Sequence, residues 1–264
     1  MSSEASFSYG YSVDFYDYIV PYGERRDIDF YKALAEEKNA PILELGCGTG
    51  RILIPLARQG TEITGLDIEP GMLERCRRKL RGEPDEVRGR VTLIEGNMRD
   101  FDLGRTFGLV TAPFRAFQHL ETAEDQISCL ESVRRHLADD GTLVLDLFNP
   151  SMAYLLDESR REEFGDEAEF TMPDGRRVLR RVRVASVDKA MQLMECEFVY
   201  YVSHPDGREE RLVHSFGVRY LFRYETEHLL SRCGFRVEAV YGGFDRSPFG
   251  SDWPGEQIFL AGKA

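Results

Sequence analysis

Short apolar runs alternate with amphipathic segments over the first 150 residues of the chain. The runs that read as buried strands are 41–45, 62–66, 91–95, 107–111 and 142–148. Segments of helical periodicity lie between them, at 50–59, from Pro70 onward, and after the N-terminal signature at 122–125. This alternation predicts an α/β fold with a doubly wound, mostly parallel sheet, in which ligands gather beyond the carboxyl ends of the strands.

The segments before and after this alternation add helices and two further strands. Residues 15–37 give two amphipathic helical stretches, rich in tyrosine and interrupted at 21–23, that precede the first strand. Near the other end, a helix over 224–233 is followed by Gly234, and runs at 235–241 and 257–261 predict an antiparallel pair of strands. The sheet is therefore predicted to have seven strands.

The alternation of strands and helices stops after Asn149. Long β-rich runs follow at 176–185, 191–203 and 209–222, the last two joined by the turn sequence HPDG. They predict an antiparallel insertion, and the chain divides into 1–150 (N-terminal lid helices and ligand-binding core), 151–222 (insertion) and 223–264 (completion of the core sheet). The arginine-rich run 176–184 suits a solvated strand face or a partner for the acidic run before it, with acidic-substrate binding as the alternative.

A glycine-rich loop follows the first strand, in the sequence PILELGCGTGR at 41–51. Gly46, Gly48 and Gly50 allow a tight turn and a close approach of backbone to ligand. A dinucleotide-binding turn has the spacing G-x-G-x-x-G, whereas here the spacing is G-x-G-x-G and Arg51 follows. A nicotinamide-dependent oxidoreductase is therefore the alternative and not the first interpretation.

The sequence ELGCGTGR resembles the first motif of the class I S-adenosylmethionine (SAM) dependent methyltransferases. Asp67 lies 21 positions past Gly46, at the end of the second predicted strand. In the family, an acid at this place accepts hydrogen bonds from the ribose hydroxyls, which we favour over a role as a helix N-cap.

Further cofactor contacts follow from the same resemblance. Asn97 and Met98, after the third strand, resemble the motif that recognises adenine, although the family often has Asp where this chain has Asn97; the alternative is an Asn in a strand-ending turn. Glu44 would orient the loop or reach the methionine amino group, or else only tie down loop amides. Arg26 resembles an arginine that holds the methionine carboxylate, or is simply solvated.

The residues of the predicted SAM site lie on the N-terminal lid, at the carboxyl ends of strands, or in the segments that directly follow these ends. Its members are Tyr16, Arg26, Glu44, Gly46, Cys47, Gly48, Gly50, Asp67, Ile68, Met72, Asn97, Met98, Ala112 and Phe114. Cys47 is included for its backbone, since no base stands beside it to activate the thiol.

Methyl transfer is an in-line displacement that needs the nucleophile within about 3 to 3.5 Å of the methyl carbon, so alignment supplies most of the rate gain. His119, in the segment TAPFRAFQHL after the fourth strand, is the candidate base, or else it bonds the backbone at the helix start after it. Tyr16 resembles a tyrosine that small-molecule methyltransferases place over the cofactor, with packing as the alternative. The motif [DNS]-P-P-[FYW] of enzymes that methylate nucleobase or amide nitrogens is replaced by TAPF.

Composition narrows the acceptor and the setting. Thirty-four Lys and Arg against 46 Asp and Glu give a net charge of −12, which disfavours nucleic acid and favours a small-molecule substrate. The five cysteines are scattered, without metal-ligand spacing, so no metal site is predicted. The sequence has neither an apolar stretch of about 20 residues nor a secretory start, which predicts a cytoplasmic protein without a membrane partner.

The insertion and the tyrosine-rich start are similar in arrangement to glycine N-methyltransferase and the sugar N-methyltransferases of antibiotic pathways. In those enzymes such strands roof the active site or form subunit contacts, which implies a substrate roof here and a possible homodimer. The sequence therefore predicts a SAM-dependent methyltransferase that acts on a nitrogen or oxygen of a small molecule, with nitrogen favoured. A protein that binds SAM without catalysis is the second alternative.

Overall fold

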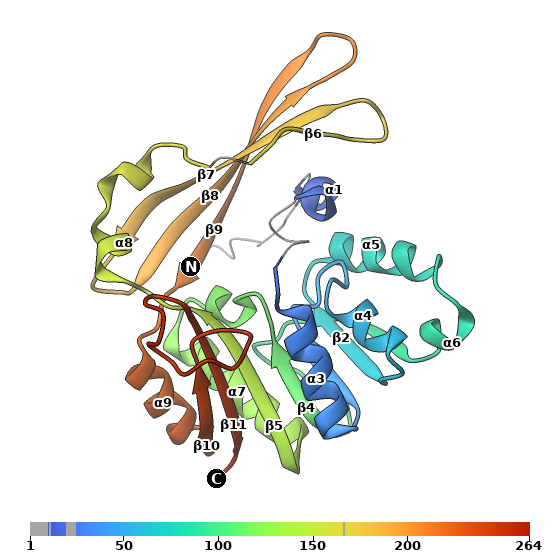
Figure 1. The fold of residues 1–264 in the computed structure, drawn as a ribbon, viewed down its shortest axis with the longest axis vertical. Coiled ribbons are helices and arrows are strands. Elements are labelled where there is room, and N and C mark those ends of the chain that lie inside the picture. The colour runs from blue at the N-terminus through green and yellow to red at the C-terminus, as the bar shows by residue number, and fades with distance from the viewer. Residues whose placement is uncertain (1–9, 11, 20–24, 166) are drawn as a thin grey trace, which may run out of the picture. The chain divides into compact units, whose positions relative to one another are not determined.

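A computed structural model describes residues 10, 12–19, 25–165 and 167–264. The chain forms two compact units (Figure 1). The larger comprises 26–151 and 220–264, and the smaller comprises 152–219 with the described residues up to 25. The break at 21–23 that the sequence predicts lies outside the described residues.

The larger unit is built on a seven-stranded sheet with the order β10-β11-β5-β4-β1-β2-β3. Its strands are β1 (Ile42–Leu45), β2 (Ile63–Asp67), β3 (Val91–Glu95), β4 (Phe107–Ala112), β5 (Leu137–Phe148), β10 (Phe235–Tyr241) and β11 (Glu256–Lys263). The pairs among β1 to β5 are parallel, and β11 is antiparallel to both of its neighbours. The predicted doubly wound, mostly parallel sheet is confirmed.

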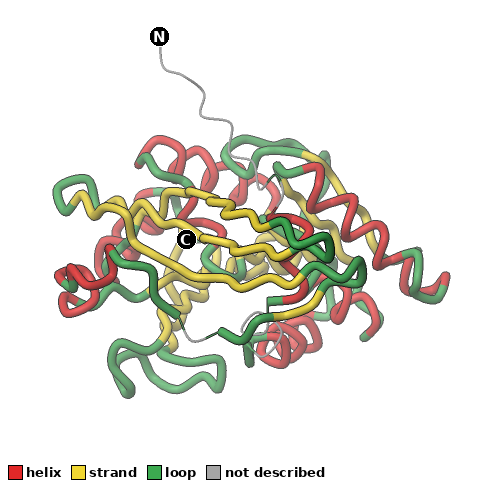
Figure 2. The backbone as a smooth tube through the Cα atoms, turned by 90° about the horizontal axis from the view of Figure 1, so that it is seen from above, coloured by secondary structure: helices red, strands yellow, loops and turns green. Residues whose placement is uncertain are grey.

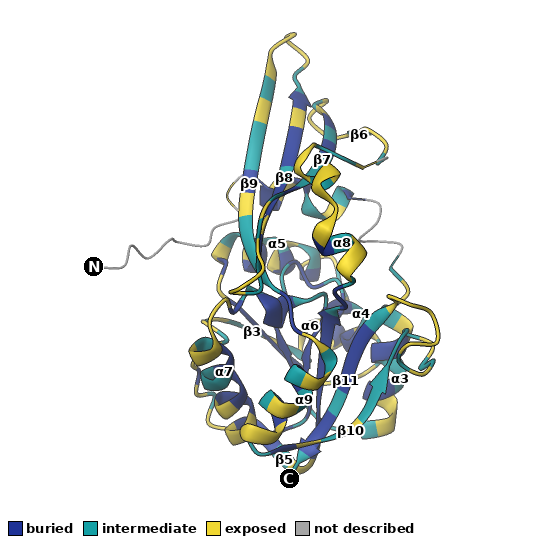
Figure 3. Cartoon of the chain, turned by 90° about the vertical axis from the view of Figure 1, so that its left-hand side faces the viewer, coloured by how far each residue is buried: buried dark blue, intermediate teal, exposed yellow. Residues whose placement is uncertain are grey.

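Helices cover both faces of this sheet. They are α3 (Ile28–Lys38), α4 (Leu53–Arg58), α5 (Pro70–Leu80), α6 (Asp85–Arg88), η2 (Ala116–His119), α7 (Ala123–His136) and α9 (Arg223–Arg232). The helices α3, α4 and α5 bury their apolar residues in one cluster, and α7 and α9 bury theirs in another. Alternate residues of the strands feed the two clusters, as with Ile42 and Leu43 of β1, so the central strands are buried on both faces (Figure 3).

Two predicted boundaries in the larger unit are wrong. The helix predicted over 50–59 spans only Leu53–Arg58, because Gly50 has a φ of +82° and belongs to the loop. The fifth strand begins at Leu137 instead of after Gly141. Leu137 is fully buried and lies opposite Phe107, while the polar sequence ADDG after it hides the start of the strand. The predicted start of α7 is confirmed, since the Thr122 side chain accepts from the amide of Asp125.

The smaller unit is a four-stranded antiparallel sheet with the order β6-β7-β8-β9 (Figure 2). Its elements are α1 (Ser12–Phe15), η1 (Tyr16–Tyr18), α8 (Met152–Leu156), η3 (Glu158–Arg161), β6 (Phe170–Thr171), β7 (Arg177–Asp188), β8 (Leu193–Ser203) and β9 (Glu209–Arg219). The HPDG turn joins β8 to β9 through a hydrogen bond from the Gly207 amide to the His204 carbonyl. The predicted antiparallel insertion is confirmed.

Arginines of β7 pair with acidic residues. Arg180 forms a bidentate pair with Glu167, and Arg177 lies 3.4 Å from Glu169, both in the acidic run before the strand. The interpretation of this arginine-rich run as a partner for the acidic run is confirmed.

Candidate SAM-binding site

The glycine loop is fixed to the neighbouring strand through its backbone. The amides of Gly46 and Cys47 both donate to the Leu66 carbonyl of β2, at 2.8 and 3.2 Å. Gly46, Gly48 and Gly50 have φ values of +68°, +53° and +82°, in the left-handed region that glycine adopts without strain. The loop therefore has one defined path at the carboxyl end of β1.

Contacts of these glycines show where the loop meets other elements. A Cβ on Gly46 would lie 2.8 Å from the Ala116 Cβ and 3.5 Å from the terminal carbon of Met98. Around Gly48, in contrast, a Cβ would meet no atom within 4 Å. The turns after β3 and β4 thus pack against the loop at Gly46, and the backbone at Gly48 is open to a ligand.

Asp67 ties the end of β2 to the open part of the loop. Its Oδ2 accepts from the Gly48 amide at 2.6 Å, and its Oδ1 accepts from the Glu69 amide at 2.9 Å. Burial raises the pKa of Asp67, and these two backbone hydrogen bonds oppose the rise. The N-cap of α5 is Glu69, whose side chain accepts from the Gly71 amide, so capping this helix is not the function of Asp67.

Glu44 lies in β1, two residues before Gly46, and is 2% exposed. Its Oε2 is buried without a hydrogen-bond partner among the described residues. Burial raises the pKa of Glu44 to about 8; Arg51 lowers it, whereas Asp27 and Asp67 raise it. A buried carboxyl oxygen without a partner is costly, which suits a group that receives a ligand.

Arg51 and Asp27 form a bidentate ion pair beside Glu44, with N···O distances of 2.7 and 2.6 Å. Asp27 is completely buried. Arg26, the residue that the sequence indicates for the methionine carboxylate, is exposed in the turn before α3.

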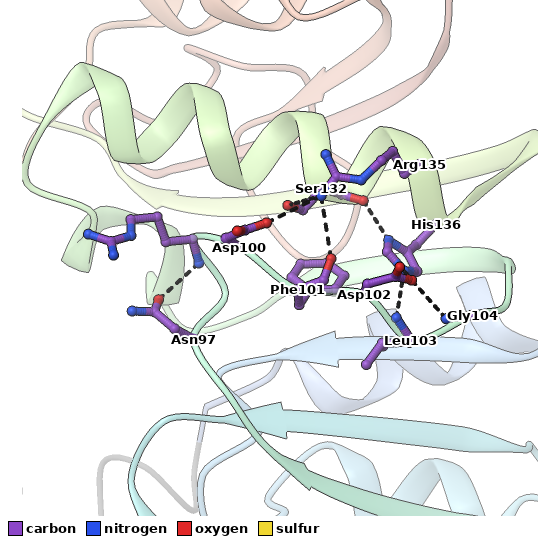
Figure 4. Close-up of polar contacts among 10 residues, drawn as sticks. Asn97, Asp100, Phe101, Asp102, Leu103, Gly104, Ser132, Arg135 and His136 are labelled. Atoms are coloured by element: carbon purple, nitrogen blue, oxygen red, sulfur yellow. Dashed lines mark hydrogen bonds and ion pairs between the residues drawn. The ribbon is translucent and has the colours of Figure 1, made fainter.

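The segment after β3 is anchored to α7 (Figure 4). The Asn97 side-chain oxygen accepts from the Arg99 amide at 2.9 Å, so Asn97 does form a strand-ending turn. Farther along, buried His136 accepts from the Leu103 amide at Nε2, at 2.8 Å, and its Nδ1 lies 2.7 Å from the Ser132 carbonyl. His136 therefore holds the segment after β3 against the last turn of α7.

The turn after β4 is strained. Phe114 and Arg115 have φ values of +54° and +67°, a conformation that is unfavourable for residues with a Cβ. Asp146, buried in β5, holds both: its Oδ2 accepts from the Phe114 amide at 2.9 Å, and its carbonyl accepts from the Arg115 amide at 3.1 Å. Ala112 at the end of β4 is fully buried in the core.

These features fit the parts of SAM. The Gly48 backbone is open, Ile68 is 44% exposed directly after Asp67, and the Glu44 oxygen without a partner can accept from an ammonium. The amides of Gly48 and Glu69 use part of the acceptor capacity of Asp67, and the remainder can accept from hydroxyls.

Comparisons with known proteins agree with this fit. A family of proteins described as "Methyltransferase domain" matches residues 42–141. The dTDP-3-amino-3,6-dideoxy-alpha-D-glucopyranose N,N-dimethyltransferase of Streptomyces fradiae is 30% identical over 78% of this chain and 74% of its own. The dTDP-3-amino-3,4,6-trideoxy-alpha-D-glucopyranose N,N-dimethyltransferase of Streptomyces venezuelae is also 30% identical, over 76% of this chain and 78% of its own length. The chain belongs to the SAM-dependent methyltransferases.

A solved structure shows the same fold. The SAM-bound amino pentose methyltransferase of Micromonospora echinaspora has a TM-score of 0.70 and 24% identity, over 94% of this chain and 96% of the other. The present chain is therefore a methyltransferase that uses SAM as the methyl donor. The nicotinamide alternative is not supported. The resemblance to sugar N-methyltransferases is confirmed, and that to glycine N-methyltransferase stays a prediction.

Of the remaining predicted site residues, Met72 and Cys47 are buried packing residues, and His119 and Tyr16 belong to different units. Met72 is buried in α5, and the Cys47 sulfur points toward Gly65, where a Cβ would meet it at 2.6 Å. Burial raises the pKa of the Cys47 thiol well above its ordinary value, as expected for a packing residue. His119 is half-buried at the end of η2 in the larger unit, whereas Tyr16 belongs to η1 in the smaller unit.

Two features escaped the sequence analysis. Asp146 stands inside the apolar run of β5, and an acid between leucines is the signal that could have revealed it. Asp27 and Arg51 are 24 positions apart and have no motif spacing; the arginine directly after the last loop glycine was the only sign.

Within the part of the chain that the structure describes, the helices lack the combined length and apolar character of a membrane span.

Proposed function

We propose that this methyltransferase methylates the amino group of a small amino sugar carried by a nucleotide. The supporting observation is that both Streptomyces relatives, each 30% identical over about three quarters of the chain, are N,N-dimethyltransferases of dTDP-linked amino sugars.

We assign cofactor contacts to the residues around the loop. Asp67 accepts from the ribose hydroxyls, Glu44 from the methionine ammonium, and Arg26 pairs with the carboxylate. Asn97, Met98 and Ile68 contact the adenine. The glycine loop, with Cys47 contributing backbone, follows the methionine portion, and Met72, Ala112 and Phe114 shape the walls.

Bound SAM supplies an electrophilic methyl group. His119 is the proposed base that accepts the proton from the acceptor amine, and Tyr16 directs its oxygen toward the reacting centre. The insertion, taken as 151–222 between a core at 1–150 and its completion at 223–264, forms a roof over the acceptor or a contact of a homodimer. The described cysteines are all free and buried, which supports a reducing cytoplasmic location.

Mass spectrometry of reactions with SAM tests the acceptor. A dTDP-linked amino sugar and its hydroxyl analogue form the matched pair, and free amino sugar serves as a third substrate. We expect methylated product from the nucleotide-linked amine only. Product from the hydroxyl analogue alone would contradict the nitrogen assignment, and equal rates with the free sugar would contradict the nucleotide carrier.

The role of His119 has its own test. Replacement by Gln keeps a similar size and a hydrogen-bonding group but removes the base, and general bases contribute typically 10²- to 10⁴-fold. We expect kcat to fall within about that range while S-adenosylhomocysteine (SAH) affinity is kept. An unchanged kcat would show that His119 only bonds backbone.

A further inference from the structure

Arg51 contacts more parts of the cofactor site than any sequence motif indicates. Its guanidinium forms the bidentate pair with Asp27, just before α3, and lies 5.2 Å from the centre of the Phe114 ring. Arg51 itself directly follows the glycine loop, and its side chain is 14% exposed. One side chain therefore joins the segment that carries Arg26, the loop, and the strained turn after β4.

We propose that Arg51, paired with Asp27, is a positioning residue of the SAM site that fixes these segments relative to one another. This role rests on the assignment of the glycine loop to SAM. The planar guanidinium is suited to it, because it can donate two parallel hydrogen bonds to Asp27 while its face lies against an aromatic ring. A lysine would supply the charge without this geometry.

The pair also sets the electrostatic environment of Glu44. The groups that act on this carboxyl are Arg51 at the loop, Asp27 before α3 and Asp67 at the end of β2; the Cys47 thiol faces it without charge. Arg51 lowers the pKa of Glu44, and Asp27 raises it. Loss of the Arg51 charge should therefore raise the pKa of Glu44, and loss of the Asp27 charge should lower it.

These opposite changes in the pKa of Glu44 distinguish a residue that positions and tunes the SAM site from one that only stabilises the fold. Calorimetry of SAH binding, across pH values on both sides of the Glu44 pKa of about 8, is the measurement. If the ionised carboxylate receives the ammonium of SAH, affinity rises with pH through this range. We expect Arg51→Met to shift that rise to higher pH and Asp27→Asn to shift it to lower pH.

Both variants should also bind SAH roughly tenfold more weakly at their own optimum, since each loses charge-assisted hydrogen bonds that fix the site. Arg51→Lys should keep the pH profile near that of the wild type but still lose affinity. Arg58→Met is the matched control, because Arg58 makes an exposed bidentate pair with Glu83 at the end of α4. Its SAH binding should be unchanged.

The outcomes are distinguishable. The wild type binds SAH in the first outcome, but the pH dependence of SAH affinity shifts in the same direction in Arg51→Met and Asp27→Asn. This result would overturn the positioning role alone. A wild type that does not bind SAH would overturn the cofactor assignment and this role with it. Circular dichroism shows whether Asp27→Asn folds. If it does not, Arg51→Met is compared with Arg51→Lys, and an equal shift of the pH dependence of SAH affinity in both would contradict the positioning role.

Discussion

Glycines of the same loop, with the same sign of φ, have different surroundings. Gly46 is packed against Ala116, whereas Gly48 has open space on its side-chain face. The first glycine is thus needed for the fold of the site, and the second for the approach of a ligand.

Gly46→Ala and Gly48→Ala should therefore differ in their effects on stability and on SAH affinity. Both carry the cost of a Cβ at positive φ, about 1 to 3 kcal/mol, and Gly46→Ala adds a steric clash. We expect Gly46→Ala to lower the free energy of unfolding by more, and Gly48→Ala to lose more SAH affinity for a given loss of stability. Urea unfolding and calorimetry measure the two quantities.

Gly207→Ala is the control, since Gly207 has a φ of +86° and open space but belongs to the HPDG turn. It should lose stability and keep SAH binding. Equal stability losses in the Gly46 and Gly48 variants would contradict the different surroundings.

Asp67→Ala should weaken SAH binding by about 1.5 to 3 kcal/mol, the range for hydrogen bonds to a charged group. The variant also releases the Gly48 amide from its 2.6 Å bond, so the loop loses part of its support. Calorimetry with the folded variant checks this, and an unchanged affinity would remove Asp67 from the site.

At the scale of elements, α7 holds the segment that follows Asn97. His136 does so from the last turn of the helix, and Thr122 caps its first turn. His136→Leu should lower the free energy of unfolding by about 1 to 3 kcal/mol for each buried group left without a partner. It should also weaken SAH binding. Thr122→Ala should cost about 1 kcal/mol with little effect on SAH. Equal SAH affinities in the two variants would show that the anchoring does not reach the adenine side.

The elements themselves were largely predictable from periodicity. Apolar runs located β1 to β4 within a residue, because strands buried on both faces leave a clear signal. The start of β5 was not predictable, since exposed acids at Asp139 and Asp140 interrupt its pattern. Likewise, the motif indicated Gly46 and Asp67, but the contact of Arg51 with Asp27 depends on tertiary packing that no local spacing encodes.

At the scale of the whole molecule, Glu44 links stability to function. Its pKa is raised from 4.5 to about 8 by burial, so the folded protein favours the protonated form. Its contribution to stability is fully present below pH 4.5 and is lost as pH rises toward about 8. Each tenfold change in the acid dissociation constant of a group corresponds to about 1.4 kcal/mol of free energy.

Glu44→Gln removes this ionisation. The free energy of unfolding of the ligand-free variant, relative to the wild type, should rise with pH across that window by a few kcal/mol. SAH binding should become weaker, because a neutral amide replaces the group that receives the ammonium. Urea unfolding at several pH values measures the difference; parallel pH profiles would contradict a titrating Glu44.

The glycine loop, Glu44 and Asp67 together are assigned to the SAM site. Calorimetric titration of the wild-type protein with SAH, beside NAD as a control, tests this assignment most directly. We expect SAH to bind and NAD not to bind, with an SAH affinity that rises as pH passes the Glu44 pKa of about 8. Binding of NAD alone, or no binding of SAH, would contradict it.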